Sequence, residues 1–275
     1  MPVRVLEILE AFVGGARRHV TDLMENLGRD RYEVSLTCST LRDSSCEEHA
    51  VRLEQQGIRV HRVPMHREIR PFSDLCCMLR LAWIIRRGGY SMVHTHSSKA
   101  GFVGRIAAAL AGCRAVVHTP HVFPFQMEGP PASQNLYVKL ERLAARFCRK
   151  IICVSLAERT AALEAGVVQE SKLVVIPNGI RPAGASHADT SSLRAGLGIP
   201  QGTLVVGSVG RLCTQKGHKY LVDAAHLMKD RFADAHFVIA GDGELRPALE
   251  EQVRSLHLEG RFHFAGHVPD PAGLY

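Results

Sequence analysis

Short apolar runs rich in β-branched residues alternate with helical patterns along the whole chain, and this alternation limits the fold more than any other feature. Such runs are typical of buried strands, and helices between them are typical of strand–helix–strand units with parallel strands. The expected strands are 3–9, 33–38, 58–63, 91–95, 115–119, 151–155, 173–177, 203–209, 236–241 and 261–266. The expected helices are 15–28, 46–56, 73–87, 99–111, 132–149, 156–165, 217–232 and 244–257. The sequence therefore predicts an α/β protein built on parallel sheets.

A change of composition divides the strands into two groups. Residues 181–202, RPAGASHADTSSLRAGLGIPQG, are rich in Ala, Gly, Ser and Pro, which is typical of a linker. We expect a first domain over residues 1–182, a linker over 183–202 and a second domain over 203–275. The second has only three expected strands, which are few for a doubly wound sheet, so we expect it to be incomplete.

Composition and charge exclude several classes of protein. The formal net charge is +7, but no run of Lys or Arg exceeds two residues, so no nucleic-acid interface is expected. The eight cysteines form no CxxC pair and are interpreted as reduced thiols of a cytoplasmic protein. The first residues are too acidic for a signal peptide, and no apolar stretch reaches the ~18 residues of a membrane span.

Ligands of open α/β sheets bind beyond the carboxyl ends of the strands, so each strand exit is a candidate site. The first exit carries Gly14 and Gly15, which suit a phosphate or sugar cradle, although an ordinary tight turn explains them equally well. The GxGxxG fingerprint of dinucleotide-binding proteins is missing, which disfavours a nicotinamide oxidoreductase.

Histidines gather at the exits of the strands expected at 91–95 and 115–119. They are His94, His96, His118 and His121. Four histidines invite a metal site, but alternate strand residues face opposite sides and no carboxylate is interleaved. We therefore expect no metal. A single histidine that hydrogen-bonds a sugar hydroxyl or moves a proton is the favoured interpretation.

The segment GSVGRLCTQKG (207–217) places two cations at the exit of a buried strand. Arg211 can bind phosphate oxygens through two parallel bonds, Lys216 adds a mobile charge, and the helix expected from Gly217 adds its positive end. One phosphate-bearing ligand would satisfy all three, whereas the alternative is a pair of solvated surface cations. At the next exit, Gly241-Asp242-Gly243 suits either a ligand contact or a plain loop before a helix.

Seven stretches together resemble glycosyltransferase family 4, retaining enzymes with the GT-B fold. In chain order they are GGARRHV, HTHSSKAGFVGRIAAALAG, HTPHVFPF, IICVS, VVIPNGI, GRLCTQKG and VIAGDGELR. The variant HTHSSKAG is most similar to members that build bacterial surface polysaccharides. The resemblance implies two Rossmann-like parallel-sheet domains, the first receiving the acceptor and the second holding a nucleotide-diphosphate sugar.

The resemblance also assigns roles to residues of this chain. Arg211, Lys216 and the N–H of Gly15 match the groups that bind the donor diphosphate, and His121 matches the catalytic histidine near the reacting sugar. Other expected cleft residues are Gly14, His96, Lys99, Asn178, Gly179, Gly241, Asp242 and Gly243. No metal or other cofactor is expected. Acceptors in this family are glycans or lipid-linked sugars, so peripheral contact with the inner face of the cell membrane stays open. The segment around Trp83 suits such contact, although an ordinary sheet-covering helix is the favoured interpretation.

One departure from the family pattern concerns its acidic pair, two Glu separated by seven residues beyond the third strand of the donor domain. Glu244 and Glu251 are separated by only six residues and lie on an earlier expected helix. We therefore expect a C-terminally truncated enzyme with weak or no activity. The alternative is a non-catalytic binding or scaffold remnant of such an enzyme.

Overall fold

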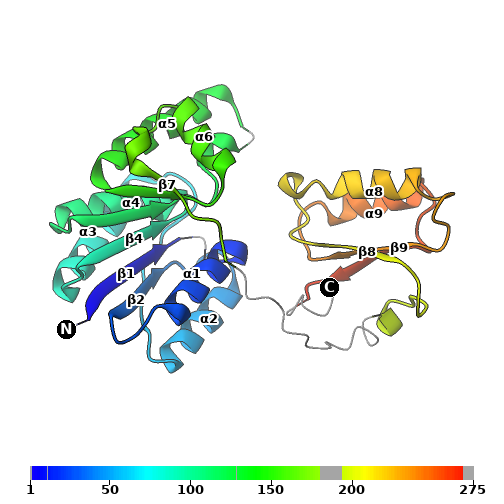
Figure 1. The fold of residues 1–275 in the computed structure, drawn as a ribbon, viewed down its shortest axis with the longest axis horizontal. Coiled ribbons are helices and arrows are strands. Elements are labelled where there is room, and N and C mark those ends of the chain that lie inside the picture. Colours follow the sequence, from blue (N-terminus) through cyan, green and yellow to red (C-terminus); the bar gives the residue numbers. More distant parts are fainter. Residues whose placement is uncertain (1, 11, 128, 180–193, 269–275) are drawn as a thin grey trace. The chain divides into compact units, whose positions relative to one another are not determined.

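The computed structural model describes residues 2–10, 12–127, 129–179 and 194–268. The chain divides into two compact units, residues 1–180 and 181–275 (Figure 1). Most of the linker expected at 183–202 lies outside the described residues.

The first unit is built on a seven-stranded sheet in which all neighbouring strands are parallel, as predicted. Its order is β3-β2-β1-β4-β5-β6-β7, so the order reverses between β1 and β4. The strands are β1 (Val3–Leu9), β2 (Tyr32–Cys38), β3 (Arg59–Arg62), β4 (Met92–His96), β5 (Ala115–Thr119), β6 (Lys150–Cys153) and β7 (Leu173–Val175). A reversal of this kind is a topological switch point, where ligands of open α/β sheets bind.

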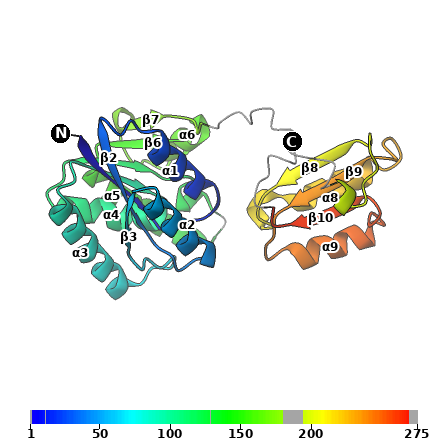
Figure 2. The same cartoon turned by 90° about the horizontal axis from the view of Figure 1, so that it is seen from below.

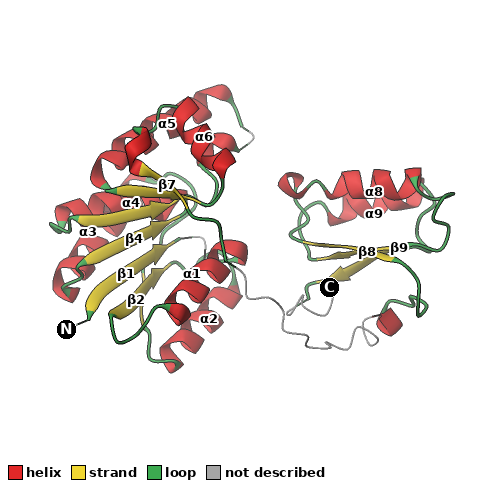
Figure 3. Ribbon diagram, viewed as in Figure 1, coloured by secondary structure: helices red, strands yellow, loops and turns green. Residues whose placement is uncertain are grey.

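Helices cover both faces of this sheet (Figure 3). They are α1 (Gly14–Asn26), α2 (Ser44–Gln55), α3 (Pro71–Gly88), α4 (Ser98–Leu110), α5 (Pro131–Ala144) and α6 (Leu156–Glu164). Successive strand residues point to opposite faces, so Ile8 packs in the core under α3 and α4 while Leu9 packs in the core under α1 and α2. The two apolar cores fix the sheet between its helical layers.

The second unit has a three-stranded parallel sheet in its described part, with the order β10-β9-β8 (Figure 2). The strands are β8 (Val205–Val209), β9 (His236–Ala240) and β10 (Phe262–Gly266), and the helices are α8 (His218–Leu227) and α9 (Arg246–Ser255). Val222 of α8 and Leu249 of α9 share one core with Ile239 and Phe262 of the sheet. The expectation of three strands is met.

Two helices end well before their expected boundaries. Helix α5 stops at Ala144 rather than near residue 149, and helix α8 stops at Leu227 rather than near residue 232. The guanidinium of Arg261 donates to the backbone oxygens of Lys229, Phe232 and Ala233. This tertiary contact holds the turns between α8 and β9 against the residue that precedes β10.

Candidate active site

A carboxylate lies among the histidines at the switch point of the first unit. Parallel pairing places Glu7 of β1 opposite His94 of β4, and His96 lies two residues further along the same strand. Glu7 Oε2 lies 3.1 Å from His94 Nδ1 and 2.7 Å from His96 Nε2. The expectation that no carboxylate joins these histidines is therefore wrong, because the carboxylate comes from the neighbouring strand and not from the same segment.

Hydrogen bonds extend this cluster at both ends. His94 Nε2 lies 2.8 Å from the hydroxyl of Thr119, at the end of β5. His96 Nδ1 lies 3.1 Å from His121 Nε2, so the predicted catalytic residue and the predicted cleft residue are brought together. His118 does not join them: its Nδ1 faces Thr95 Oγ1 at 3.0 Å and its ring packs against Gly101. The expectation that the four histidines do not all converge is confirmed.

The loop that carries His121 has an unusual backbone that is held by a buried carboxylate. His121 and Val122 have φ angles of 54° and 93°, a region that L-residues rarely adopt. Glu158 accepts the N–H groups of Val122 and Val154, each at 2.7 Å. Ser155 Oγ accepts the Glu158 N–H at the start of α6, which is the first half of a capping box. The Glu158 side chain instead holds the His121 loop.

Two further groups reach this cluster from other elements. The His19 ring, on α1, lies 4.8 Å from the His121 ring, centroid to centroid, in an edge arrangement. The side chain of Asn178 lies close enough to His19 to oppose the lowering of the pKa of that ring, which places this predicted cleft residue near the cluster. Sequence reasoning missed Glu7 and His19. The available signals were a carboxylate inside the apolar run VRVLEIL and a histidine one turn into GGARRHV.

Burial lowers the pKa of three rings of this cluster. Desolvation lowers the pKa of His96 to about 3 and that of His121 to about 4, and it also lowers the pKa of His19. Burial alone would raise the pKa of Glu7, but charge and hydrogen bonds from His94 and His96 outweigh it and hold this pKa well below its ordinary value. At neutral pH the Glu7 carboxylate is therefore ionised, and the rings of His96 and His121 are uncharged.

The cluster contains atoms that could ligate a metal. Within the part of the chain that the structure describes, His19, His96 and His121 form one group of three, and Glu7, His94 and His96 form another, with ligand atoms within 4.8 Å of one another. Imidazole nitrogen and carboxylate oxygen suit Zn²⁺. The hydrogen bonds above account for these close approaches without an ion, and the absence of a metal stays a prediction.

The pH dependence of stability tests whether the buried rings of His96 and His121 are uncharged in the folded chain. His96 and His121 have folded-state pKa values below the ordinary 6.5, so the unfolded chain binds protons that the folded chain excludes. Their contribution is complete above pH 6.5 and is lost as the pH falls toward the folded values. Between pH 7 and pH 5 we expect the free energy of unfolding to fall by about 2 kcal/mol for each histidine. Urea unfolding followed by Trp83 fluorescence measures this loss, and equal stability at both pH values would contradict it.

The other predicted site residues of the first unit differ in how accessible they are to a ligand. Gly14 and Gly15 begin α1, with open space around both, and Gly14 has a φ of 55° that favours glycine. Lys99 is engaged elsewhere: its Nζ lies 2.6 Å from Asp74 Oδ2 of α3, and its side chain is only 9% exposed. Gly179 follows Asn178 at the end of the described part of this unit.

In the second unit, Arg211 and Lys216 both lie beyond the carboxyl end of β8. The aliphatic stem of Lys216 packs over Gly210, with Cγ and Cδ within 3.7 Å of the point where a Cβ would stand. The Arg211 guanidinium is exposed and forms a 2.9 Å ion pair with Glu244. Gly217 adopts a φ of 64° and begins α8, so the positive helix end lies directly after Lys216.

Gly241 and Gly243 have a role in packing between loops. A Cβ on Gly241 would lie 2.0 Å from the carbonyl oxygen of Gly210, and one on Gly243 would lie 2.5 Å from that of Leu212. The Leu212 N–H donates to the Asp242 carbonyl at 3.0 Å. These glycines therefore let the loop after β9 support the loop that carries Arg211 and Lys216.

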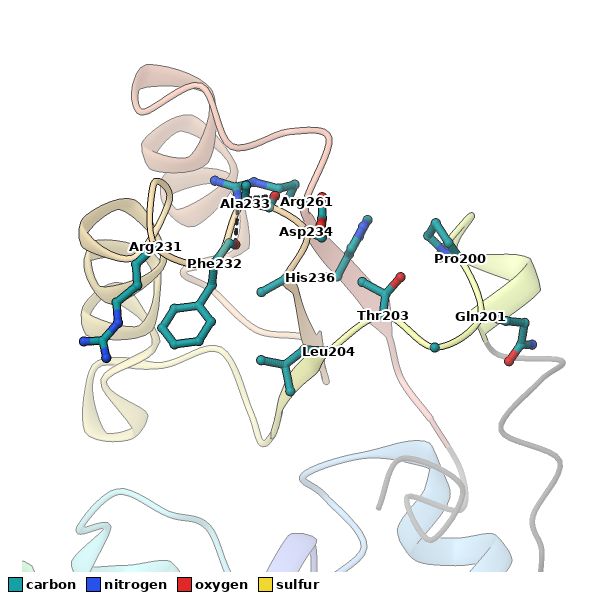
Figure 4. Close-up of a pocket in the computed structure, with 12 residues that line it drawn as sticks. Pro200, Gln201, Thr203, Leu204, Arg231, Phe232, Ala233, Asp234, His236 and Arg261 are labelled. Carbon is teal, nitrogen blue, oxygen red and sulfur yellow. Dashed lines mark hydrogen bonds between the residues drawn. The ribbon is translucent and has the colours of Figure 1, made fainter.

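A hollow of the second unit lies at the opposite end of its sheet. A cavity of about 820 Å³ is lined by residues at the amino ends of β8 and β9, including Leu204 and His236 (Figure 4). Its Arg261 is already bonded to backbone carbonyl groups. Because parallel sheets bind ligands at their carboxyl ends, this hollow is not the candidate site.

Comparisons with known proteins match both units. The profile of Glycosyltransferase Family 4 matches residues 13–183, and that of Glycosyl transferases group 1 matches residues 189–275. A UDP-Gal:alpha-D-GlcNAc-diphosphoundecaprenol alpha-1,3-galactosyltransferase of Escherichia coli is 31% identical over 264 residues, covering 94% of this chain and 67% of the relative. A 2-deoxystreptamine glucosyltransferase of Streptomyces kanamyceticus is 30% identical, covering 79% of this chain and 61% of the relative. The chain thus spans about two thirds of the length of these relatives.

Solved structures show the same fold. Anabaena HepE, determined in complex with UDP and glucose, matches with a TM-score of 0.77 and 24% identity over 99% of this chain and 71% of that one. A glycosyltransferase from Rickettsia africae matches with a TM-score of 0.76 and 19% identity over 100% of this chain and 70% of that one. The chain belongs to glycosyltransferase family 4, and its two parallel-sheet units have the architecture of the GT-B fold.

Proposed function

We propose that this protein transfers a sugar from a nucleotide-diphosphate sugar to a glycan or lipid-linked acceptor in polysaccharide biosynthesis. The observation that carries the proposal is the placement of Arg211 and Lys216 together at the exit of β8, next to the start of α8. A diphosphate is the ligand that matches two cations and a positive helix end.

The chemistry follows from the charges that develop when the anomeric bond breaks. The sugar becomes oxocarbenium-like and the departing diphosphate gains negative charge. Arg211, Lys216 and the N–H of Gly15 would stabilise that charge without a metal, and each such preorganised donor contributes roughly 3 kcal/mol. His121 would contact the reacting sugar. Asn178 lies near His19 and would support this part of the site.

Nucleotide binding tests the proposal directly. UDP or GDP in excess should raise the melting temperature, because a ligand at a hundred times its Kd stabilises the folded state by about 2.7 kcal/mol. UMP and GMP lack the second phosphate and should give a smaller shift. If no nucleotide diphosphate shifts the melting temperature of the folded chain, the non-catalytic scaffold is the better interpretation.

Helix α3 supports the proposal of peripheral membrane contact. One face packs in the core through Cys77, Leu81 and Ile85, which confirms that it is a sheet-covering helix. The opposite face carries a stripe of large apolar side chains, of which Phe72 is 88% and Trp83 60% exposed. The full stripe is Phe72, Leu75, Leu79 and Trp83, and the exposed arginines at its side are Arg80, Arg86 and Arg87.

This stripe, with its arginines, matches a bilayer with anionic headgroups. Among the described residues, no helix combines the length and hydropathy that crossing a membrane requires. Contact would therefore be peripheral, and it would place the first unit beside a lipid-linked acceptor.

We expect the chain to sediment with vesicles that contain anionic lipid and to bind neutral vesicles more weakly. The double variant Phe72→Ser/Trp83→Ser should lower the bound fraction at least tenfold, because both rings lose their apolar contact with the bilayer. The control is Leu227→Ser in the second unit, which removes an equally exposed apolar side chain outside the stripe. Absence of binding to anionic vesicles would refute the membrane contact.

A further inference from the structure

The hydrogen bonds around His121 form a chain whose inner end is an anion. Glu7 is 1% exposed and, being ionised, can only accept hydrogen bonds. Its Oε2 atom faces His94 Nδ1 and His96 Nε2. Both nitrogen atoms must therefore carry a proton, which removes the freedom of these rings to change tautomer.

The direction of the next bond follows from this assignment. A neutral His96 that is protonated on Nε2 has a lone pair on Nδ1. The partner of that lone pair is His121 Nε2 at 3.1 Å, which must therefore carry the shared proton. A neutral His121 protonated on Nε2 has its own lone pair on Nδ1.

We propose that Glu7 and His96 are positioning residues that fix the tautomer of His121, so that His121 Nδ1 accepts a hydrogen bond from a hydroxyl group of the transferred sugar. The inference rests on the proposed sugar transfer and deepens it by assigning a direction to the contact. It also explains why a carboxylate and a second histidine are buried behind His121.

Two observations on the same loop support a fixed ring. The strained backbone at His121 and Val122 is held by the carboxylate of Glu158. Such strain persists only where the surroundings determine the conformation, and it concentrates at functional sites. The His19 ring packs edge-on against His121 and limits its rotation.

The neutral tautomer suits the reaction. Burial keeps the pKa of His121 near 4, so its ring carries no charge at neutral pH. A neutral ring with a lone pair on Nδ1 does not oppose the positive charge that develops on the sugar, whereas an imidazolium would. A neutral ring protonated on Nδ1 would require the proton of the His96–His121 bond to lie on His96, leaving a bare nitrogen against the Glu7 carboxylate.

Nuclear magnetic resonance of the full chain with ¹⁵N-labelled histidine rings tests this direction. At pH 7 we expect the shared proton to be covalently bound to His121 Nε2, with coupling across the hydrogen bond to a bare His96 Nδ1. His121→Asn and His96→Asn assign the two rings. A proton found on His96 Nδ1, or an outward N–H on His121 Nδ1, would overturn the proposal.

Variants of Glu7 separate positioning from packing. Glu7→Leu removes the acceptor and should average the His121 tautomers, whereas Glu7→Gln keeps an acceptor oxygen and should restore the single tautomer. His61, bonded to the Tyr90 hydroxyl outside the cluster, is the internal reference and should not change. An unchanged His121 in folded Glu7→Leu would exclude the role of Glu7. UDP and GDP binding, measured on the same samples, reports separately on the proposed function.

Discussion

Replacing Lys216 by alanine is expected to weaken the binding of UDP or GDP by about ten- to hundred-fold. A hydrogen bond between charged groups is worth about 1.5–3 kcal/mol, and each 1.4 kcal/mol is a factor of ten in Kd. Lys216 packs its stem on Gly210 and lies directly before the start of α8, so a diphosphate bound at this helix end would be within reach of its flexible side chain. Titration calorimetry of wild type and variant with each nucleotide measures the loss.

The matched control is Lys219→Ala, three residues further along the same helix end. Lys219 lies over the Tyr220 ring at 4.8 Å and has no part in the proposed site, so its removal should leave the Kd nearly unchanged. Equal effects of the two substitutions on the Kd would mean that nucleotide binding depends only on the net charge of the chain. In any longer form that transfers sugar, Lys216→Ala should also lower turnover by two to three decades.

The variant Arg211→Ala tests whether the Arg211 guanidinium binds the nucleotide or stabilises the fold. Its ion pair with Glu244 is exposed, and such pairs contribute little to stability. Arg211→Ala should therefore weaken nucleotide binding without lowering the melting temperature of the free chain. A large loss of stability would mean that the guanidinium is structural.

Much of the fold was predictable because each buried strand corresponds to a short apolar run in the sequence. Strand β1 has the expected bounds, 3–9, and β5 has the expected bounds, 115–119. Both strands lie inside the sheet and most of their side chains are buried or half-buried, so the apolar run alone identifies them. The contact that holds segment 228–234 was not predictable, because the partner of its carbonyl groups is Arg261, which is distant in the chain.

The candidate site was predictable only in part, for a related reason. The strand exits indicated His96 and His121, but the order of the strands in the sheet determines which side chains lie next to these histidines. Glu7 reaches His94 only because β4 pairs with β1, and the helical pattern that includes His19 does not show which strand exit α1 faces. Likewise, GDG suggested a close approach to a ligand, whereas Gly241 and Gly243 approach the backbone of 210–212.

Removal of the Glu141 carboxylate is expected to be the most destabilising single change in the first unit. Arg105 of α4 is fully buried, and its guanidinium lies 2.7 Å from Glu141 Oε2 of α5. Its Nε also donates to the Gly101 carbonyl at 2.6 Å. Glu141→Ala leaves a buried, uncompensated charge, which costs about 3–5 kcal/mol. Urea unfolding followed by Trp83 fluorescence measures the loss against a total stability of about 5–15 kcal/mol.

Two further variants test whether the buried charge, and not lost packing, causes the loss of stability in Glu141→Ala. The double variant Arg105→Met/Glu141→Leu removes both charges and keeps apolar volume, so it should recover most of the stability. Glu33→Ala breaks an exposed pair with Arg4 and should cost at most about 1 kcal/mol. If the double variant loses as much as Glu141→Ala, packing explains the effect. Loss of the Arg105–Glu141 pair should also disturb the site, because α4 begins at Ser98, directly after His96 and Ser97, and packs Gly101 against His118.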